Sequence, residues 1–198
     1  MIRATGAMGY YHASFTTVPR AASGGYLDKV FVMMMWYKAF SLHVLLRMGF
    51  HVLFQDVDLV WFKSPLQHMH KHMQNDQGEF EYEAYLSDDG ARAIRYSPFF
   101  ANSGFYYLRS TESTRSFSYS VMLGFDILHA TGSHQNVFTF RLLENMELFP
   151  NTKKKFLNLL DFPSGVKFHH DKNFMQKIVK KTAHPFIFHM CWTGKSFS

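Results

Sequence analysis

The feature that most constrains this chain is a short apolar run that ends in two carboxylates. Residues 50–54 read FHVLF, and Asp56 and Asp58 follow them, one residue apart. A short, mostly apolar run of this kind predicts a buried strand. Side chains at positions i and i+2 of an extended chain point to the same side, so we expect the two carboxylates to converge. The sequence therefore predicts a strand that ends at an acidic edge.

Two carboxylates at the end of a strand favour a small divalent cation. Mg²⁺ and Mn²⁺ commonly take one or two protein carboxylates and complete their coordination with phosphate and water. We therefore interpret Asp56 and Asp58 as metal ligands. We expect the metal to bind a nucleotide diphosphate. The alternative for Asp56 is a structural carboxylate that caps a helix or pairs with a basic residue.

The length and charge of the chain limit its partners. Its 198 residues are 47% hydrophobic, which suits one globular domain. The net charge is +6, with lysine runs at residues 153–155 and 180–181. This charge favours a phosphate-bearing or acidic ligand, although a lysine run is more often a solvated surface. Nucleic acid would also suit the charge, but no aromatic–basic motif of a known binding module occurs, so we expect no nucleic-acid partner.

Cysteine and apolar content bear on disulfides and membranes. Cys191 is the single cysteine, which excludes an intrachain disulfide. The longest apolar run, residues 30–36, is far shorter than the roughly 20 residues of a membrane-spanning helix. The start of the chain lacks the apolar core of a signal peptide. We therefore expect membrane contact only through a segment absent from this chain.

The remaining pattern predicts alternating helices and strands. Residues 1–28, rich in small residues, predict an irregular lead-in, and residues 29–198 predict the folded domain. Apolar spacing predicts a helix over residues 30–48 that Gly49 ends with a left-handed turn, and this helix and the strand after it form half of a βαβ unit. We also expect strands over 82–86, 104–109 and 185–189, and helices over 111–130 and 135–143. The pattern predicts an α/β fold whose ligands lie at the carboxyl ends of strands.

Four ordered segments carry a family resemblance. They read GFHVLFQDVDLVWFKSPL, ANSGFYYLRST, GSHQNVFT and FHMCWTGK, and they span roughly residues 38–195. Together they resemble the nucleotide-diphospho-sugar transferases related to plant cell-wall xylosyl- and arabinosyltransferases, including the rhamnogalacturonan-II xylosyltransferases. The resemblance implies a GT-A-like mixed sheet flanked by helices, a nucleotide-sugar donor, a divalent cation and retention of anomeric configuration. It also implies a glycan or glycoprotein acceptor and a Golgi location.

The same resemblance assigns metal ligands. Asp56 and Asp58 match the acidic pair that binds metal and diphosphate, and His189 matches a histidine that supplies a third ligand. Neutral imidazole suits Mn²⁺ better than Mg²⁺, so we expect Mn²⁺, with Mg²⁺ as the alternative. The competing interpretation of His189 is a hydrogen-bonded core histidine.

The other matched residues are expected to bind donor and acceptor. Lys38 and Lys195 match basic positions, and Lys195 would neutralise the leaving diphosphate. Asp88 matches an acid near the donor sugar, and no carboxylate is identified as a nucleophile. The remaining expected donor- and acceptor-binding residues are Asn102, Ser103, Gly104, Gln135, Trp192 and Gly194. Among them, Gly104 would leave room for close approach, and Trp192 would stack on a sugar face.

Two departures from the family pattern bear on activity. His134 stands where the family usually has an aspartate, and a histidine offers no fixed negative charge near neutral pH. The family's first nucleotide-binding strand has no counterpart in residues 1–28. A catalytically inactive domain that binds a sugar nucleotide or glycan is therefore the alternative to a transferase.

Two histidine-rich stretches have a spacing that suggests a metal cluster. His68, His70 and His72 lie in a polar stretch that predicts a loop or short helix, and His169 and His170 precede Asp171. We interpret both groups as solvated loops, because the surrounding residues are polar.

Overall fold

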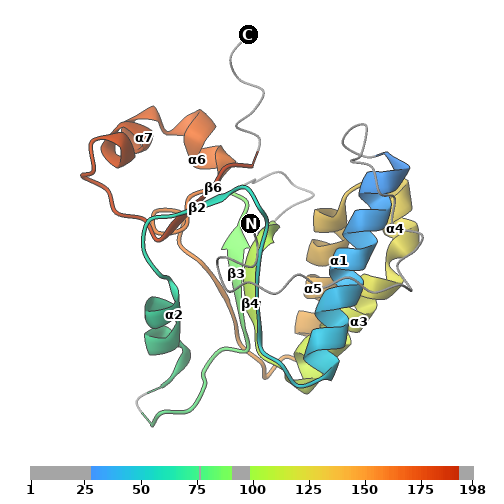
Figure 1. Ribbon diagram of the computed structural model, residues 1–198. Coiled ribbons are helices and arrows are strands. Elements are labelled where there is room, and N and C mark those ends of the chain that lie inside the picture. Colours follow the sequence, from blue (N-terminus) through green and yellow to red (C-terminus); the bar gives the residue numbers. More distant parts are fainter. Residues whose placement is uncertain (1–27, 76, 91–98, 192–198) are drawn as a thin grey trace, which may run out of the picture.

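A central mixed sheet organises the molecule, and helices lie on both sides of it (Figure 1). The computed structural model describes residues 28–75, 77–90 and 99–191. The strands of this sheet are, in spatial order, β1 (Val52–Gln55), β4 (Ala101–Leu108), β3 (Ala84–Asp88) and β5 (Lys154–Phe156). β4 runs antiparallel to β1 and β3, whereas β5 runs parallel to β3. The predicted α/β fold, with a mixed sheet flanked by helices, is confirmed.

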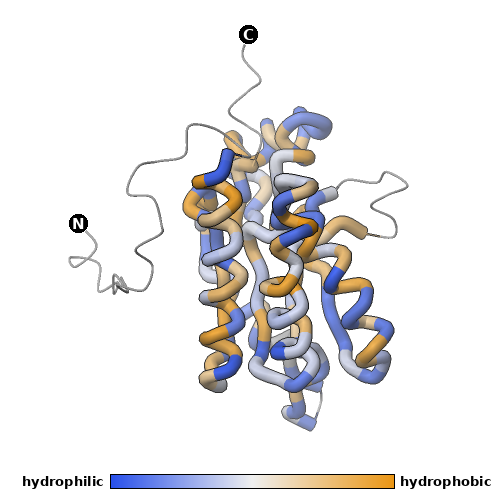
Figure 2. The backbone as a smooth tube through the Cα atoms, turned by 90° about the vertical axis from the view of Figure 1, so that its right-hand side faces the viewer, coloured by the Kyte–Doolittle hydropathy of each residue, from blue (hydrophilic) through white to orange (hydrophobic). Residues whose placement is uncertain are grey.

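Four helices cover one face of the sheet, on the right in Figure 1. They are α1 (Lys29–Arg47), α3 (Glu112–Leu123), α4 (Phe125–Thr131) and α5 (His134–Leu148). These helices pack against alternate residues of β3 and β4, among them Leu86 and Tyr106, which are fully buried. From their outer side, apolar and polar segments alternate along the helices, as expected when each has one buried side (Figure 2).

A smaller layer covers the opposite face. β2 (Leu59–Trp61) and β6 (Ile187–His189) form a two-stranded antiparallel sheet. The helices on this side are α2 (Leu66–Met73), α6 (Gly165–His170) and α7 (Lys172–Val179) (Figure 1). Tyr85 and Phe105 point to this side and form a second core with Ile187. Both faces of β3 and β4 are therefore buried.

The predicted first helix and its end are confirmed. The side chain of Asp28 caps α1 by accepting a hydrogen bond from the backbone N–H of Phe31 at 2.7 Å. Gly49 follows the helix with φ +89°, and the N–H groups of Gly49 and Phe50 donate to the carbonyls of Leu46 and Leu45. This left-handed turn satisfies the last carbonyls and directs the chain into β1.

α1 also has the length and apolar composition to cross a membrane. Its buried residues, Val32, Ala39, Leu42 and Leu46, belong to the core formed with the sheet and the other helices. Its Lys38 forms an ion pair with Asp56. These contacts make α1 a core helix of this domain.

Several predicted elements differ from those observed. The helix predicted over residues 111–130 is two helices, because Gly124 ends α3 and precedes α4. Thr111 caps α3, and Thr114 completes its capping box. Among the described residues β1 is an edge strand with an antiparallel neighbour, so the expected βαβ pairing is not seen there. The strands β2 and β5 and the helix α7 were not predicted, and residues 1–27 lie outside the described ranges.

The interpretation of the lysine and histidine runs was partly wrong. Lys154 is not a solvated lysine, because it belongs to β5 and its Nζ lies 3.0 Å from a carboxylate oxygen of buried Glu83. The histidines of residues 68–72 lie on α2 rather than in a loop, with the ring of His68 4.5 Å from that of Phe186. His169 and His170 end α6.

Candidate functional site

Asp56 and Asp58 lie in the turn between β1 and β2, at one end of the central sheet. The N–H of Asp56 donates to the carbonyl of Gly104 at 2.7 Å, which extends the pairing of β1 with β4. The carbonyl of Asp58 accepts from the N–H of Met190 at 2.9 Å, beside the pairing of β2 with β6. The two sheets therefore fix the two aspartates from different sides.

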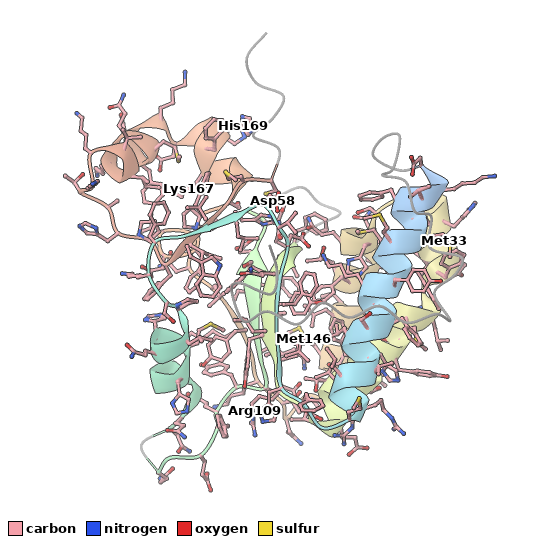
Figure 3. The ribbon with its side chains drawn as sticks, viewed as in Figure 1. Met33, Asp58, Arg109, Met146, Lys167 and His169 are labelled. Atoms are coloured by element: carbon pink, nitrogen blue, oxygen red, sulfur yellow. The ribbon has the colours of Figure 1, made fainter. Side chains whose placement is uncertain are left out.

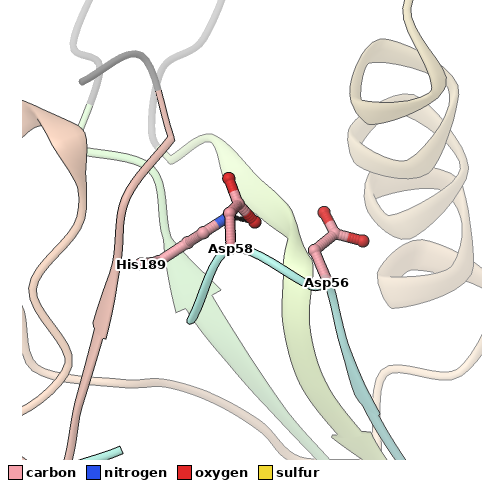
Figure 4. Close-up of side chains that lie close together, drawn as sticks. All are labelled: Asp56, Asp58 and His189. Carbon is pink, nitrogen blue, oxygen red and sulfur yellow. Dashed lines mark hydrogen bonds and ion pairs between the residues drawn. The ribbon is translucent and has the colours of Figure 1, made fainter. Parts of the chain in front are cut away.

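The two carboxylates converge with His189, as shown in Figure 4. One ligand atom from each of the three side chains lies within 4.8 Å of the others, and Nε2 of His189 lies 3.2 Å from Oδ1 of Asp58. Neighbouring ligands around Mg²⁺ or Mn²⁺ are about 3 Å apart when each bond is about 2.1 Å. In the described part of the chain, no other three His, Cys, Asp or Glu side chains approach in this way.

The local geometry behind this convergence differs from the prediction. Val57 is fully exposed at the tip of a turn, so Asp56 and Asp58 do not project from one extended strand. The tight turn, held at both ends by strand pairing, brings the carboxylates together instead.

Gly104 in β4 lies directly beneath the three side chains. A Cβ at this position would lie 2.8 Å from Oδ2 of Asp56 and 2.8 Å from Nε2 of His189. Real Cβ atoms do not approach other atoms this closely. The absent side chain therefore provides the space that the carboxylate and the imidazole occupy.

Lys38 connects α1 to the acidic pair. Its Nζ lies 2.9 Å from Oδ1 of Asp56 and 4.4 Å from the centre of the Phe54 ring, and its side chain is only 8% exposed. Burial lowers the pKa of Lys38, while the charge of Asp56 opposes that shift. Because Lys38 engages Oδ1, the other oxygen of Asp56 is the one that lies near Gly104 and His189.

His189 is not satisfied as an ordinary core histidine would be. It is buried, and its Nε2 approaches Asp58, yet its Nδ1 has no hydrogen-bond partner among the described residues. A buried polar atom without a partner costs free energy, so residues of this kind commonly belong to ligand sites.

Asn102 and Asp89 form the next layer of the site. The amide nitrogen of Asn102 donates to Oδ1 of Asp89 at 2.7 Å, and its oxygen accepts from the N–H of Gly104 at 2.8 Å. Burial raises the pKa of Asp89, while hydrogen bonds from Asn102 and Gln135 oppose the shift. The Oδ2 atom of Asp89 is buried, and no hydrogen-bond partner for it lies in the described part of the chain.

Asp89, which follows the predicted residue Asp88, is the acid to which Asn102 donates. Side chains alternate along a strand, so Asp89 shares its side with Ser87, which pairs with Asn102. The side chain of Asp88 accepts a hydrogen bond from the N–H of Gly90 at 2.8 Å. Asp89 was not among the predicted site residues, although its alternation from Ser87 was a signal for it.

The N-terminus of α5 forms another wall. The side-chain oxygen of Gln135 accepts from the N–H of Ser103 at 3.2 Å. His134 is 5% exposed, and within residues 28–75, 77–90 and 99–191 its Nδ1 has no hydrogen-bond partner. Burial lowers the pKa of His134 to about 3, and the charge of Lys38 acts in the same direction. His134 is therefore a neutral imidazole near neutral pH.

A cleft of about 1190 Å³ joins these groups. Its polar lining includes Lys38, Asp56, Asp58, Asn102, Ser103, His134, Gln135, His189 and Cys191, and its apolar lining comes largely from α1 and β1. Burial raises the pKa of the Cys191 thiol to about 12. The predicted residues Trp192, Gly194 and Lys195 lie outside the described residues. A cleft of this size with a few polar groups is typical of a small-molecule site.

Comparison with known proteins identifies the family. A family model described as nucleotide-diphospho-sugar transferase matches residues 1–196, including the stretch predicted as a lead-in. An uncharacterized protein of Arabidopsis thaliana is 30% identical to this chain over 91 residues. The matched stretch is 46% of this chain and 24% of that relative, so this chain spans only part of the relative's length. No solved structure matches. Because the family model spans nearly the whole chain, the chain belongs to the nucleotide-diphospho-sugar transferase family.

Proposed function

We propose that this domain is a metal-dependent glycosyltransferase that moves a sugar from a nucleotide diphosphate to a hydroxyl of a glycan or glycoprotein. The observation that carries the proposal is the convergence of Asp56, Asp58 and His189 beside the cleft. Membership of the nucleotide-diphospho-sugar transferase family supports a nucleotide-sugar donor.

The three converging residues fit a divalent cation. Two carboxylates and one imidazole suit Mn²⁺, and Mg²⁺ is the alternative. Two observations support the fit, namely the buried, unpartnered nitrogen of His189 and the space left by Gly104. When bound, such an ion would neutralise the negative charge that develops on the departing diphosphate.

The protein's own residues would orient this ion site and the donor. Lys38 fixes one oxygen of Asp56 and adds positive charge near the diphosphate position. Asn102 links Asp89 to the backbone of Gly104 and so holds the floor of the cleft. We propose that Lys195 also faces the leaving diphosphate, and that Gly194 and Trp192 contact the donor or acceptor.

For the transfer step we propose retention of configuration. The acceptor hydroxyl would attack the anomeric carbon from the side of the leaving group as the sugar–phosphate bond breaks. Its proton would pass to an oxygen of the departing diphosphate. This route requires no carboxylate nucleophile.

The resemblance to plant xylosyl- and arabinosyltransferases supports narrower proposals. We propose a pentose or hexose donor, an acceptor in a cell-wall polysaccharide or glycoprotein, and a Golgi location.

Hydrolysis of a panel of UDP-sugars, with Mn²⁺ or with EDTA, tests the proposal. We expect slow Mn²⁺-dependent hydrolysis of at least one donor, and a loss of about 10²-fold or more in Asp58→Asn, because a metal ligand is removed. Asp126→Asn is the matched control, since Asp126 is an exposed carboxylate on α4. Equal rates in the two variants would contradict the proposal.

A non-catalytic domain that binds a sugar nucleotide is the second candidate. It is favoured by His134, a buried neutral group that lines the cleft. Donor binding without turnover of any sugar in the panel would support this candidate.

A further inference from the structure

The N-terminal end of α5 brings a partial positive charge to the cleft. Residues 133–136, which we call the α5 wall, all line the cleft, and the side chain of Ser133 accepts from the N–H of Asn136 at 3.4 Å. Met146, near the other end of α5, lies well below Asp58 in Figure 3, so the N-terminal end is the one that approaches the metal-binding residues. The first turn of α5 contains no acidic residue that would offset the charge of this helix end. The α5 wall therefore favours an anionic group in the cleft.

Lys38 adds a full positive charge beside the α5 wall. Its side chain lines the same cleft from α1. Burial lowers the pKa of His134, and the charge of nearby Lys38 lowers it further. An ammonium group has three N–H donors, and the hydrogen bond from Lys38 to Oδ1 of Asp56 uses one of them. Lys38 can therefore also donate to an anionic group that lies between Asp56 and the α5 wall.

His134 and Gln135 supply uncharged donors at the same place. His134 is buried, and its Nδ1 forms no hydrogen bond with any described residue. A neutral imidazole keeps one N–H that can donate. The side-chain oxygen of Gln135 accepts from the N–H of Ser103, and its amide nitrogen donates to Asp89. Because an amide nitrogen carries two hydrogens, Gln135 can also donate to a ligand.

The described lining of the cleft contains few acids that would repel an anion. Asp56 and Asp58 are the carboxylates among the described lining residues, and a divalent cation bound to them would balance both charges. At position 134 the chain departs from the family pattern, in which an aspartate would add a negative charge to the α5 wall. An anionic ligand would therefore meet donors at this wall and no opposing carboxylate.

We propose that the donor is a nucleotide-activated uronic acid, whose sugar carboxylate binds between Lys38 and the α5 wall. This inference rests on the proposed function, which supplies the metal-bound diphosphate that anchors the donor, and it narrows the proposed sugar to an oxidised hexose. A uronic acid carries its carboxylate on the same ring as the anomeric carbon, in place of the hydroxymethyl group of the parent sugar. Because Lys38 contacts Asp56 and lies close to His134, a sugar ring held at its diphosphate can reach the α5 wall.

A carboxylate suits these donors better than the hydroxymethyl group of a neutral sugar. Hydrogen bonds to an ionised acceptor are roughly twice as strong as those between neutral groups. A carboxylate has enough lone pairs to accept from Lys38, His134 and Gln135 together. A neutral sugar would leave some of these buried donors without an acceptor, which costs free energy and selects against it.

Donor binding, measured by titration calorimetry in the presence of Mn²⁺, tests this inference. Two matched pairs are compared, UDP-glucuronate with UDP-glucose and UDP-galacturonate with UDP-galactose. We expect the acidic member of at least one pair to bind the parent protein about tenfold or more tightly than its neutral counterpart. His134→Asp is expected to weaken uronate binding by about 10- to 100-fold, because the new carboxylate repels that of the sugar. The same variant is expected to change UDP-glucose binding much less.

His184→Asp is the matched control. It changes the net charge of the protein by the same amount, at an exposed position between α7 and β6. This variant is expected to keep the parental preference, which separates the local effect from the overall charge. His134→Gln keeps an uncharged donor at the α5 wall and is also expected to keep the preference. The comparison within the parent protein decides the matter even where His134→Asp fails to fold.

Several results would overturn the inference. These are equal affinity of the parent for both members of each pair, an unchanged preference in folded His134→Asp, or a lost preference in His184→Asp. Absence of binding to either uronate would do the same. Competition by free glucuronate as strong as that by UDP-glucuronate would also overturn it, because the carboxylate would then bind independently of the donor.

Turnover separates this inference from the proposed function. Mn²⁺-dependent hydrolysis of UDP-glucose, without preferred binding of a uronate, would support the proposed function and overturn the inference. Preferred binding of a uronate, without turnover of any donor, would support the inference and contradict the transferase function.

Discussion

At the scale of single residues, Gly104 determines how closely the side chains of Asp56 and His189 approach each other. Asp56 follows the first of the described strands, and His189 ends the last of them, yet both side chains lie next to the space above Gly104. Sequence spacing does not show such a meeting, because 133 positions separate the two side chains. The pairing of strands with β4 and β2 creates it.

We predict that Gly104→Ala weakens Mn²⁺ binding by about 10- to 100-fold, the range found when groups that orient metal ligands are altered. The added Cβ would displace the Asp56 carboxylate and the His189 ring. Titration calorimetry with Mn²⁺ measures the change. Gly78→Asn is the control, because nothing lies within 4 Å of a Cβ there and asparagine tolerates its positive φ. Unchanged affinity in Gly104→Ala would argue against the proposed ligand set.

His134 predicts a pH dependence of stability. Its pKa is about 3 in the folded protein, against 6.5 as the ordinary value. Below pH 6.5 the unfolded chain binds a proton that the folded protein does not, so stability falls as the pH decreases towards 3. Between pH 6.5 and 5 this linkage amounts to about 2 kcal/mol.

Replacement of His134 by Gln removes the titrating group. Between pH 6.5 and 5 we therefore expect the free energy of unfolding to fall by about 2 kcal/mol less in His134→Gln than in the parent. Urea unfolding at several pH values measures the difference. His184→Gln, at an exposed position, is expected to follow the parent. Parallel curves for the parent and His134→Gln would show that His134 is accessible to protons when folded.

At the scale of secondary-structure elements, a buried polar network joins the sheet to its helices. Glu83, beside the start of β3, accepts hydrogen bonds from the hydroxyls of Thr111 and Ser113 and pairs with Lys154 of β5. Burial favours a raised pKa for Glu83, but hydrogen bonds from Ser113, Lys154 and Thr111 outweigh it and lower the pKa. Glu83 is therefore held as a charged group in the core.

We predict that Lys154→Met destabilises the protein by about 3–5 kcal/mol, because it leaves a buried carboxylate without its cation. Lys154 is 2% exposed and Glu83 is 6% exposed. Lys153→Met is the matched control, since the side chain of Lys153 is 61% exposed and pairs with Glu81 at the surface. Urea unfolding is expected to show a much smaller change there. Similar losses in both variants would mean that the buried pair has no special role.

The elements that the sequence predicted are those with strong local signals. The first helix was found because apolar spacing and Gly49 act within a few residues, and the glycine does adopt a positive φ. β2 and β5 each have three residues, and they form because β6 and β3 lie beside them. Lys154 looks like a surface residue in the sequence, since its partner Glu83 is distant along the chain.

At the scale of the whole molecule, the site lies where the two layers meet. The central sheet holds Asp56 through Gly104, whereas the small sheet holds Asp58 through Met190 and carries His189. An ion bound to all three residues would link the layers directly. Ligands that bind only the folded state stabilise it, so this linkage has a measurable thermal consequence.

We predict that Mn²⁺ raises the melting temperature, because an ion shared by both layers must leave when they separate. At a concentration 100-fold above its dissociation constant, the ion adds about 2.7 kcal/mol of stability. For a domain of this size that corresponds to an increase of roughly 5–10 °C. Differential scanning fluorimetry with and without EDTA measures it, with Asp126→Asn expected to keep the increase and Asp58→Asn to lose it. An equal increase in Asp58→Asn would place the stabilising ion elsewhere, because removal of one of three ligands must weaken a site that they share.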